Sequence, residues 1–235
     1  MEHNQNTYAP QYEKSLTLGQ YTAKTFLLMF VGLLVTFGVA CTIALSRRIQ
    51  IFFFNNIYWM FIGFLVEIIL VIVLSAAIRK LSPGAAYVLF FLYALINGLS
   101  MGLILTLYDA TFAIMVFALS AVVFGAMGVW GYYTDVDFSK WKNVLLAGLI
   151  GLLLVGLLGI FINLSALELV ISFVGVAFFM AYTAYDTQKI KAYYFQLLGD
   201  QAMLQKASII SALELYLDFI NIFLYLLRLF SRSRD

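Results

Sequence analysis

Residues 207–230 read ASIISALELYLDFINIFLYLLRLF, an apolar run that nevertheless carries Glu214, Asp218 and Asn221. A membrane span needs about 20 mostly apolar residues, so this run is long enough to cross a bilayer. Asp186 lies in AYDTQKI near the end of the preceding apolar run, and Glu67 lies inside GFLVEIILVIV. We expect no Lys or Arg deep in these runs, and an unpaired carboxylate in hydrocarbon costs several kcal/mol. The pattern therefore indicates a membrane protein that handles cations or protons.

The composition of the 235-residue chain excludes a soluble domain, because 64% of the residues are hydrophobic and only 11% are charged. Soluble domains carry about 25% charged residues. The only cysteine is Cys41 and the only histidine is His3, in the polar N-terminal tail. The membrane region thus offers no internal disulfide, no Cys-based metal site and no His-dependent catalysis. Gly98-Leu99-Ser100-Met101-Gly102 matches a hydrolase nucleophile pattern, but it lies in a helical run without a base, so we interpret Ser100 as a packing residue.

Seven apolar runs predict seven transmembrane helices, since only helices satisfy every backbone group of such segments in lipid. Residues 1–20 form a polar tail, and 21–235 form one membrane domain with an all-α fold. Ser82-Pro83-Gly84 marks a stop and restart, and Gly199 is a candidate end for the sixth helix. The last run is long enough to cross, although a segment that dips in and returns would keep the C-terminal arginines inside. The predicted spans are roughly 23–45, 57–78, 85–107, 112–133, 143–163, 167–188 and 207–230.

The positive residues predict that the N-terminus is cytoplasmic. With that orientation, the tail and the even-numbered loops hold nine of them, and the odd-numbered loops hold only Arg47 and Arg48. The C-terminal end adds Arg228, Arg232 and Arg234. The nine are Lys14, Lys24, Arg79, Lys80, Lys140, Lys142, Lys189, Lys191 and Lys206.

The carboxylates carry the candidate chemistry. Glu214, Asp218 and Asn221 share one helical face, and Asp218 lies about 16 Å along the last helix. Asp186 precedes a cytoplasmic loop, so it can face Asp218 from a neighbouring helix. Two close carboxylates share a proton and can titrate near neutrality, and when deprotonated their oxygens suit Ca²⁺. The alternative is that these acids are protonated and only hold helices together.

Residues 182–190, YTAYDTQKI, and 212–228, ALELYLDFINIFLYLLR, resemble the signature of the Bax inhibitor-1 family, also called the transmembrane BAX inhibitor motif family. The resemblance covers nearly the whole chain. It implies six helices packed around a central seventh, and a pH-sensitive calcium leak with Asp186 and Asp218 as the paired acids. It also implies that Glu67 and Arg79 are the second-helix acid and its basic latch. Other relatives regulate cell death or bind a membrane-embedded AAA protease.

We therefore expect a pH-sensitive Ca²⁺ leak channel that is not an enzyme and needs no cofactor. Asp186 and Asp218 would form the proton-sensing gate and bind Ca²⁺ transiently, and Glu214, Glu67 and Asn221 would line the path. Its expected partners are the lipid bilayer, Ca²⁺ and a membrane AAA protease, without nucleic acid, in a bacterial inner membrane. The alternatives are a non-conducting regulator that binds a membrane protein, and an ion-coupled transporter.

Overall fold

The computed structural model describes residues 16–162 and 164–232, so most of the predicted tail at 1–20, including His3, lies outside the described residues. The described part is helical and contains no strand. Seven of its helices are long and apolar enough to cross a membrane, which confirms the all-α polytopic membrane fold. The helices are α1 (Leu18–Leu45), α2 (Arg47–Asn55), α3 (Ile57–Ala77), α4 (Pro83–Leu105), α5 (Ala110–Tyr133), α6 (Lys142–Phe161), α7 (Glu168–Gln196) and α8 (Gln201–Arg232), with short 3-10 turns η1 (Phe138–Trp141) and η2 (Ser165–Leu167).

Local sequence sets where several helices begin and end. Thr17 caps α1, and its hydroxyl accepts a hydrogen bond from the backbone N–H of Gln20. Ser82 caps α4 in the same way, with Pro83 in the first helical position, where a missing N–H costs nothing. The predicted stop and restart at this point is confirmed. Gly199 adopts φ +99°, a conformation that favours glycine, and it separates α7 from α8.

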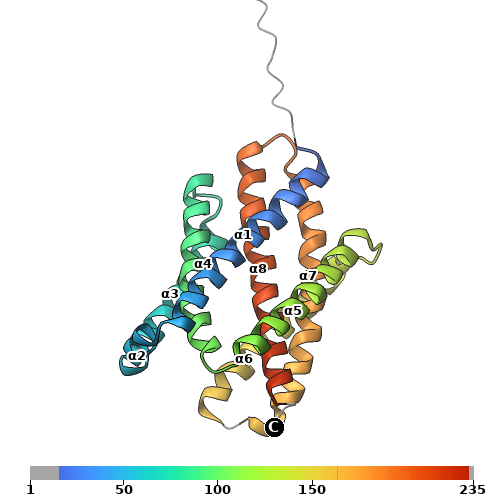
Figure 1. The fold of residues 1–235 in the computed structure, drawn as a ribbon. Helices are drawn as coiled ribbons and strands as arrows, with labels where there is room; N and C mark the ends of the chain where they lie inside the picture. The colour runs from blue at the N-terminus through green and yellow to red at the C-terminus, as the bar shows by residue number, and fades with distance from the viewer. Residues whose placement is uncertain (1–15, 163, 233–235) are drawn as a thin grey trace, which may run out of the picture.

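Helices α7 and α8 extend beyond the predicted spans, and α7 ends at Gln196, close to the candidate end at Gly199. The segment 189–206, expected to be a polar loop, is helical except for residues 197–200. Helix α8 is continuous over 32 residues, or about 48 Å, so it crosses the bundle once. Figure 1 shows the start of α1 and the end of α8 at opposite ends of the molecule. The alternative of a last segment that returns to its starting side is therefore wrong.

Helix α8 is the most buried of the spans: 67% of its most apolar stretch is inside the protein, against 6% for α6. It packs against α7, α1, α5 and α4, while α3 packs mainly on α4 and α6 lies against α7 and η1. The implied arrangement of six helices around the last one is not confirmed, since α3 and α6 lie at the edge of the bundle.

Small residues let α4 approach α1 closely. A Cβ atom on Gly98 would lie 2.8 Å from the Thr36 carbonyl oxygen, and one on Gly102 would lie 3.0 Å from that of Ala40. Both distances are shorter than ordinary contacts, so only glycine fits. Both glycines are therefore packing positions within the bundle.

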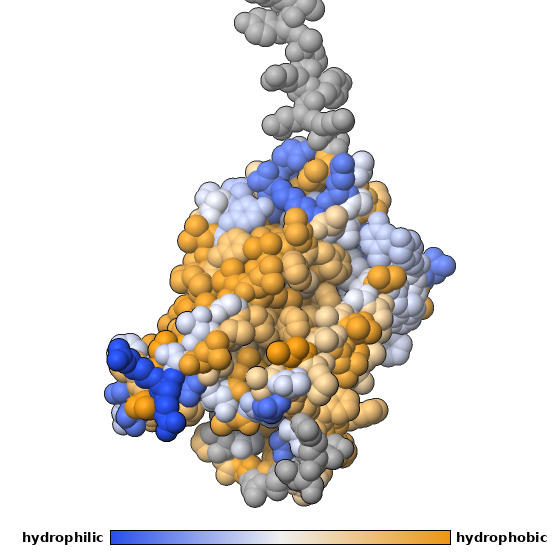
Figure 2. Space-filling model, in the orientation of Figure 1, coloured by the Kyte–Doolittle hydropathy of each residue, from blue (hydrophilic) through white to orange (hydrophobic). Residues whose placement is uncertain are grey.

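The outer surface is broadly apolar. Figure 2 shows hydrophobic residues across the middle of the visible face, with hydrophilic residues gathered at its upper end and at the lower left. Large exposed apolar side chains occur on spans such as α3 and α6, including Phe61, Phe64, Leu153 and Leu157. Such a surface is stable when lipid covers it.

Candidate functional site

Asp186 and Asp218 lie at the interface of α7 and α8, and both are only 3% exposed. The two helices follow one another after a short loop and pack along their length, which brings the residues together. The two carboxyl groups are close enough to interact electrostatically. Within the described residues no hydrogen bond joins them, and Oδ1 of Asp186 and Oδ2 of Asp218 are buried without a hydrogen-bond partner. Sharing of a proton between them stays a prediction.

Lys189 enters the same interface, where the sequence led us to expect no positive charge. Its ammonium lies 2.5 Å from Glu214 Oε1 and 3.7 Å from Asp186 Oδ1. The expectation failed because we assigned Lys189 to a loop, whereas α7 continues to Gln196 and places it one turn beyond Asp186. The long apolar stem of lysine lets the charged end reach inward. The spacing of Asp186 and Lys189, i and i+3, was the available signal.

Two aromatic rings complete the surroundings of the ammonium. Nζ of Lys189 lies 5.8 Å from the ring centre of Tyr185 and 5.7 Å from that of Tyr193, within the range of cation–π attraction. The lysine side chain is 23% exposed, so it also reaches water.

Asp186, Lys189, Glu214 and Asp218 together form what we call the acid cluster. Its charged groups act on one another: Asp218 interacts with both other acids and with Lys189. One ammonium cannot balance three carboxylates, so the cluster retains uncompensated negative charge unless it takes up protons or a cation. Buried uncompensated charge is costly, which makes such uptake favourable.

Asn221 lies on the same face of α8 as Glu214 and Asp218, as predicted, but its amide is occupied locally. Its Nδ2 donates a hydrogen bond of 2.8 Å to the Leu217 carbonyl oxygen. In the described structure Asn221 therefore forms no hydrogen bond with Asp186, Glu214 or Asp218. No group of three or more His, Cys, Asp and Glu side chains in the described part of the chain is arranged to hold a metal ion.

Glu67 has partners other than the predicted latch. Its Oε1 accepts a hydrogen bond of 2.6 Å from Ser100, and its Oε2 accepts one of 3.3 Å from Asn97. Among the described residues Arg79 forms no ion pair with it. The two positions are twelve residues apart, or about 18 Å along a helix, which is beyond the reach of the arginine. Ser100, interpreted as a packing residue, is thus a hydrogen-bond donor to a buried acid.

A chain of hydrogen bonds continues from Glu67 to the other side of α8. The Tyr216 hydroxyl donates to Asn97 Oδ1 at 2.8 Å and is hydrogen-bonded to Thr36 at 2.6 Å. We call Thr36, Glu67, Asn97, Ser100 and Tyr216 the Glu67 network. Two helical positions correspond to about 200°, so Tyr216 points away from Glu214 and Asp218. Helix α8 therefore separates the acid cluster from the Glu67 network. Of the Glu67 network, only Glu67 itself was predicted from the sequence as a functional residue.

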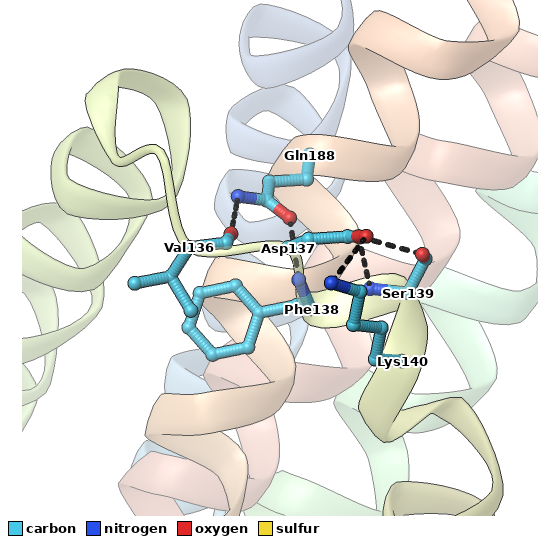
Figure 3. A network of polar contacts seen from close by, with 6 residues as sticks. All are labelled: Val136, Asp137, Phe138, Ser139, Lys140 and Gln188. Atoms are coloured by element: carbon cyan, nitrogen blue, oxygen red, sulfur yellow. Dashed lines mark hydrogen bonds and ion pairs between the residues drawn. The ribbon is translucent and has the colours of Figure 1, made fainter.

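The segment that carries Asp186 is fixed to the loop between α5 and α6 (Figure 3). Nε2 of Gln188 donates to the Val136 carbonyl oxygen at 2.6 Å, and its Oε1 accepts from the Phe138 backbone N–H at 3.1 Å. In the same loop, hydrogen bonds from the side chain and the backbone N–H of Ser139 hold the pKa of the Asp137 carboxyl below its ordinary value. These contacts could not be predicted from the sequence, because all of them depend on the fold of the loop.

The sequence also matches a known family. The sequence model described as "Inhibitor of apoptosis-promoting Bax1" matches residues 18–235. The chain belongs to the Bax inhibitor-1 family. The resemblance carried by the motifs around Asp186 and Asp218 is thereby confirmed, and the two motifs contain all four residues of the acid cluster.

Three bacterial relatives match this member of the Bax inhibitor-1 family over almost their whole length. "Inner membrane protein YbhL" of Escherichia coli (strain K12) is 41% identical over 218 residues, which cover 92% of this chain and 93% of the relative. A protein of Borreliella burgdorferi is 33% identical over 223 residues, covering 95% and 96%. "Uncharacterized protein RP147" of Rickettsia prowazekii is 34% identical over 218 residues, covering 93% and 92%.

Proposed function

We propose that this protein is a pH-sensitive cation leak channel that lets Ca²⁺ cross a bacterial inner membrane, with its N-terminus in the cytoplasm. The observation that carries the proposal is the charge imbalance of the acid cluster, in which the buried carboxyls of Asp186 and Asp218 and the partly exposed carboxyl of Glu214 face one ammonium. The cluster can be balanced by protons or by a cation, and the two compete for the same oxygens. The proposed inner-membrane location is based on the name of the Escherichia coli relative. The proposed orientation of the N-terminus is based on the distribution of the positive residues.

Within this proposal, Asp186 and Asp218 form the gate. When they hold a proton, the acids need no further cation and α7 stays packed on α8. When they lose it, repulsion between the carboxylates and their attraction for a cation favour an open path. Oδ1 of Asp186 and Oδ2 of Asp218 accept no hydrogen bond, so they are available as transient ligands for a hard cation such as Ca²⁺ once Lys189 moves away from Asp186.

Lys189 acts in the proposal as an internal cation tethered to α7. Its ammonium holds Glu214 and lies near Asp186, so it occupies part of the space that a passing cation would use. Ca²⁺ would have to displace the ammonium or pass beside it. Asn221 keeps its predicted place along the path, and Glu67, which lies on the other side of α8, adds negative field to it.

Flux measurements test the proposal directly. The purified protein is placed in liposomes that contain a calcium-sensitive dye, and flux is recorded between about pH 5 and about pH 8. We expect wild-type flux to change with pH, and Asp186→Asn and Asp218→Asn each to abolish that change. Asp135→Asn, in an exposed loop, removes one carboxylate and should behave as wild type.

Liposomes that contain the wild-type protein and leak no faster than empty ones at any pH would contradict the channel. The acid cluster would then be a structural contact, and the alternative of a non-conducting regulator would be tested by co-purification with a membrane protease. A pH response that survives both aspartate substitutions would refute the gate while leaving the channel.

A further inference from the structure

Helix α2, a nine-residue segment between two spans, was not predicted from the sequence. It has the sequence RRIQIFFFN, and none of its residues is buried. It packs against α1 and α3, the spans that it joins, and Figure 1 places it at the edge of the bundle. A helix of nine residues is about 14 Å long, well short of the roughly 30 Å of a bilayer core. It therefore lies at the membrane surface where α1 ends and α3 begins.

A polar side chain fixes the position of α2 against α1. Nε2 of Gln50 donates hydrogen bonds to the carbonyl oxygens of Ile43, at 3.1 Å, and Ala44, at 2.7 Å. These carbonyls belong to the last turn of α1, where few helical partners remain, and the Ile43 carbonyl also accepts from the Ser46 backbone N–H at 3.1 Å. The two bonds from Gln50 tie α2 to the end of α1, so α2 is a built element of the surface.

The outer side of α2 combines positive charge with large apolar side chains. Arg47 and Arg48 are exposed, and no carboxylate of the described residues forms an ion pair with either. Ile51, Phe52 and Phe54 are 51%, 50% and 53% exposed. Figure 2 shows a strongly hydrophilic group beside hydrophobic residues at the lower left, where Figure 1 places α2.

Like the arginines at the end of α8, these two arginines are exceptions in the distribution of positive charge. They are the only Lys or Arg residues in the odd-numbered loops, on the membrane side opposite the start of α1. The proposed channel assigns them no role, and their charge has no protein partner in the described structure. A guanidinium group matches the oxygens of a phosphate better than other cations do, because it presents paired donors in one plane.

We propose that α2 binds the headgroups of anionic phospholipids in the leaflet opposite the N-terminal end of α1. Arg47 and Arg48 contact the phosphates with their long side chains, while Ile51, Phe52 and Phe54 on the same outer side reach the boundary of the acyl chains. The lipid fills a surface that no part of the described chain covers, and it holds the connection between α1 and α3 in place. This inference does not depend on ion conduction.

Lipid titration of the purified full-length protein in detergent tests the inference. Phosphatidylglycerol is the probe, phosphatidylcholine is the neutral comparison, and bound lipid is counted by native mass spectrometry. Each surface arginine strengthens binding to an anionic lipid about five-fold, so Arg47→Gln with Arg48→Gln should weaken phosphatidylglycerol binding about 30-fold. Arg47→Lys with Arg48→Lys should retain part of the affinity, and inorganic phosphate should not compete.

The matched control removes the same charge on the other side of the membrane. Lys140→Gln with Lys142→Gln changes two exposed lysines, one in η1 beside Asp137 and one at the start of α6, and should leave the tightest phosphatidylglycerol site unchanged. Circular dichroism establishes that each variant is folded. Unchanged binding by the double arginine variant would overturn the inference, and so would an equal loss in the double lysine variant, because binding would then reflect net charge alone.

Discussion

The contact between Lys189 and Glu214 makes an unequal prediction for its two partners. Removing one partner from a fully buried ion pair costs about 3–5 kcal/mol. Here the side chains are 23% and 26% exposed, so water screens part of the interaction and we expect Lys189→Gln to cost about 2–3 kcal/mol. Glu214→Gln should cost about 1 kcal/mol, because Lys189 keeps Asp186 as a partner and one of three mutually repelling carboxylates is lost.

A double-mutant cycle measures this contact. The free energy of reversible unfolding in mixed micelles is determined for the wild type, the two single variants and Lys189→Gln with Glu214→Gln. We expect the double variant to be more stable than the sum of the single effects by about 1–2 kcal/mol. Lys191→Gln is the matched control, because this lysine donates to the Tyr132 carbonyl oxygen instead and should add to Glu214→Gln without coupling.

Two outcomes of the cycle would refute the reasoning. Additive effects within about 0.5 kcal/mol would mean that the ammonium does not compensate Glu214. A larger cost for Glu214→Gln than for Lys189→Gln would mean that Lys189 does not also serve Asp186.

Three further predictions concern the framework around the site. Tyr216→Phe should lower the unfolding free energy by about 1–3 kcal/mol, because it leaves a buried amide oxygen of the Glu67 network without its donor; thermal unfolding measures this. Gly131→Ala should cost about 1–3 kcal/mol, because its Cβ would lie 2.5 Å from the Ala184 carbonyl oxygen, whereas Gly125→Ala meets nothing within 4 Å and should be neutral in the same assay. The pKa of Asp137 is lower in the folded protein than in the unfolded chain. The ionised carboxylate therefore stabilises the loop at pH values above the unfolded pKa, and this stabilisation is lost as pH falls through the folded pKa. Amide exchange in the loop between α5 and α6 should accelerate only below about pH 4, and Asp137→Asn should abolish this acceleration.

The spans could be predicted from the sequence because apolar length and the demand for internal backbone hydrogen bonds leave few alternatives. Helix α2 could not, since nine residues with two arginines do not resemble a span. The crossing by α8 could not be decided from composition, because the C-terminal arginines and the length of the run pointed in opposite directions.

The acids of the site could be predicted because charge within an apolar run is conspicuous, but their partners could not. Lys189 was misplaced because a charged residue at the end of a span was assigned to a loop. Asn97, Ser100 and Tyr216 carry no charge, so nothing in the sequence distinguishes them from packing residues. Their roles depend on which helices become neighbours, and that is a property of the fold.

The proposed gate requires that Asp186 and Asp218 share one proton. Infrared difference spectroscopy of the protein in lipid, recorded against pH, measures this through the carboxylic acid band. If the two residues share a proton, one band disappears as pH rises, and Asp186→Asn and Asp218→Asn each remove that band completely. Separate bands, each lost in only one of the two variants, would show two independent acids and contradict it.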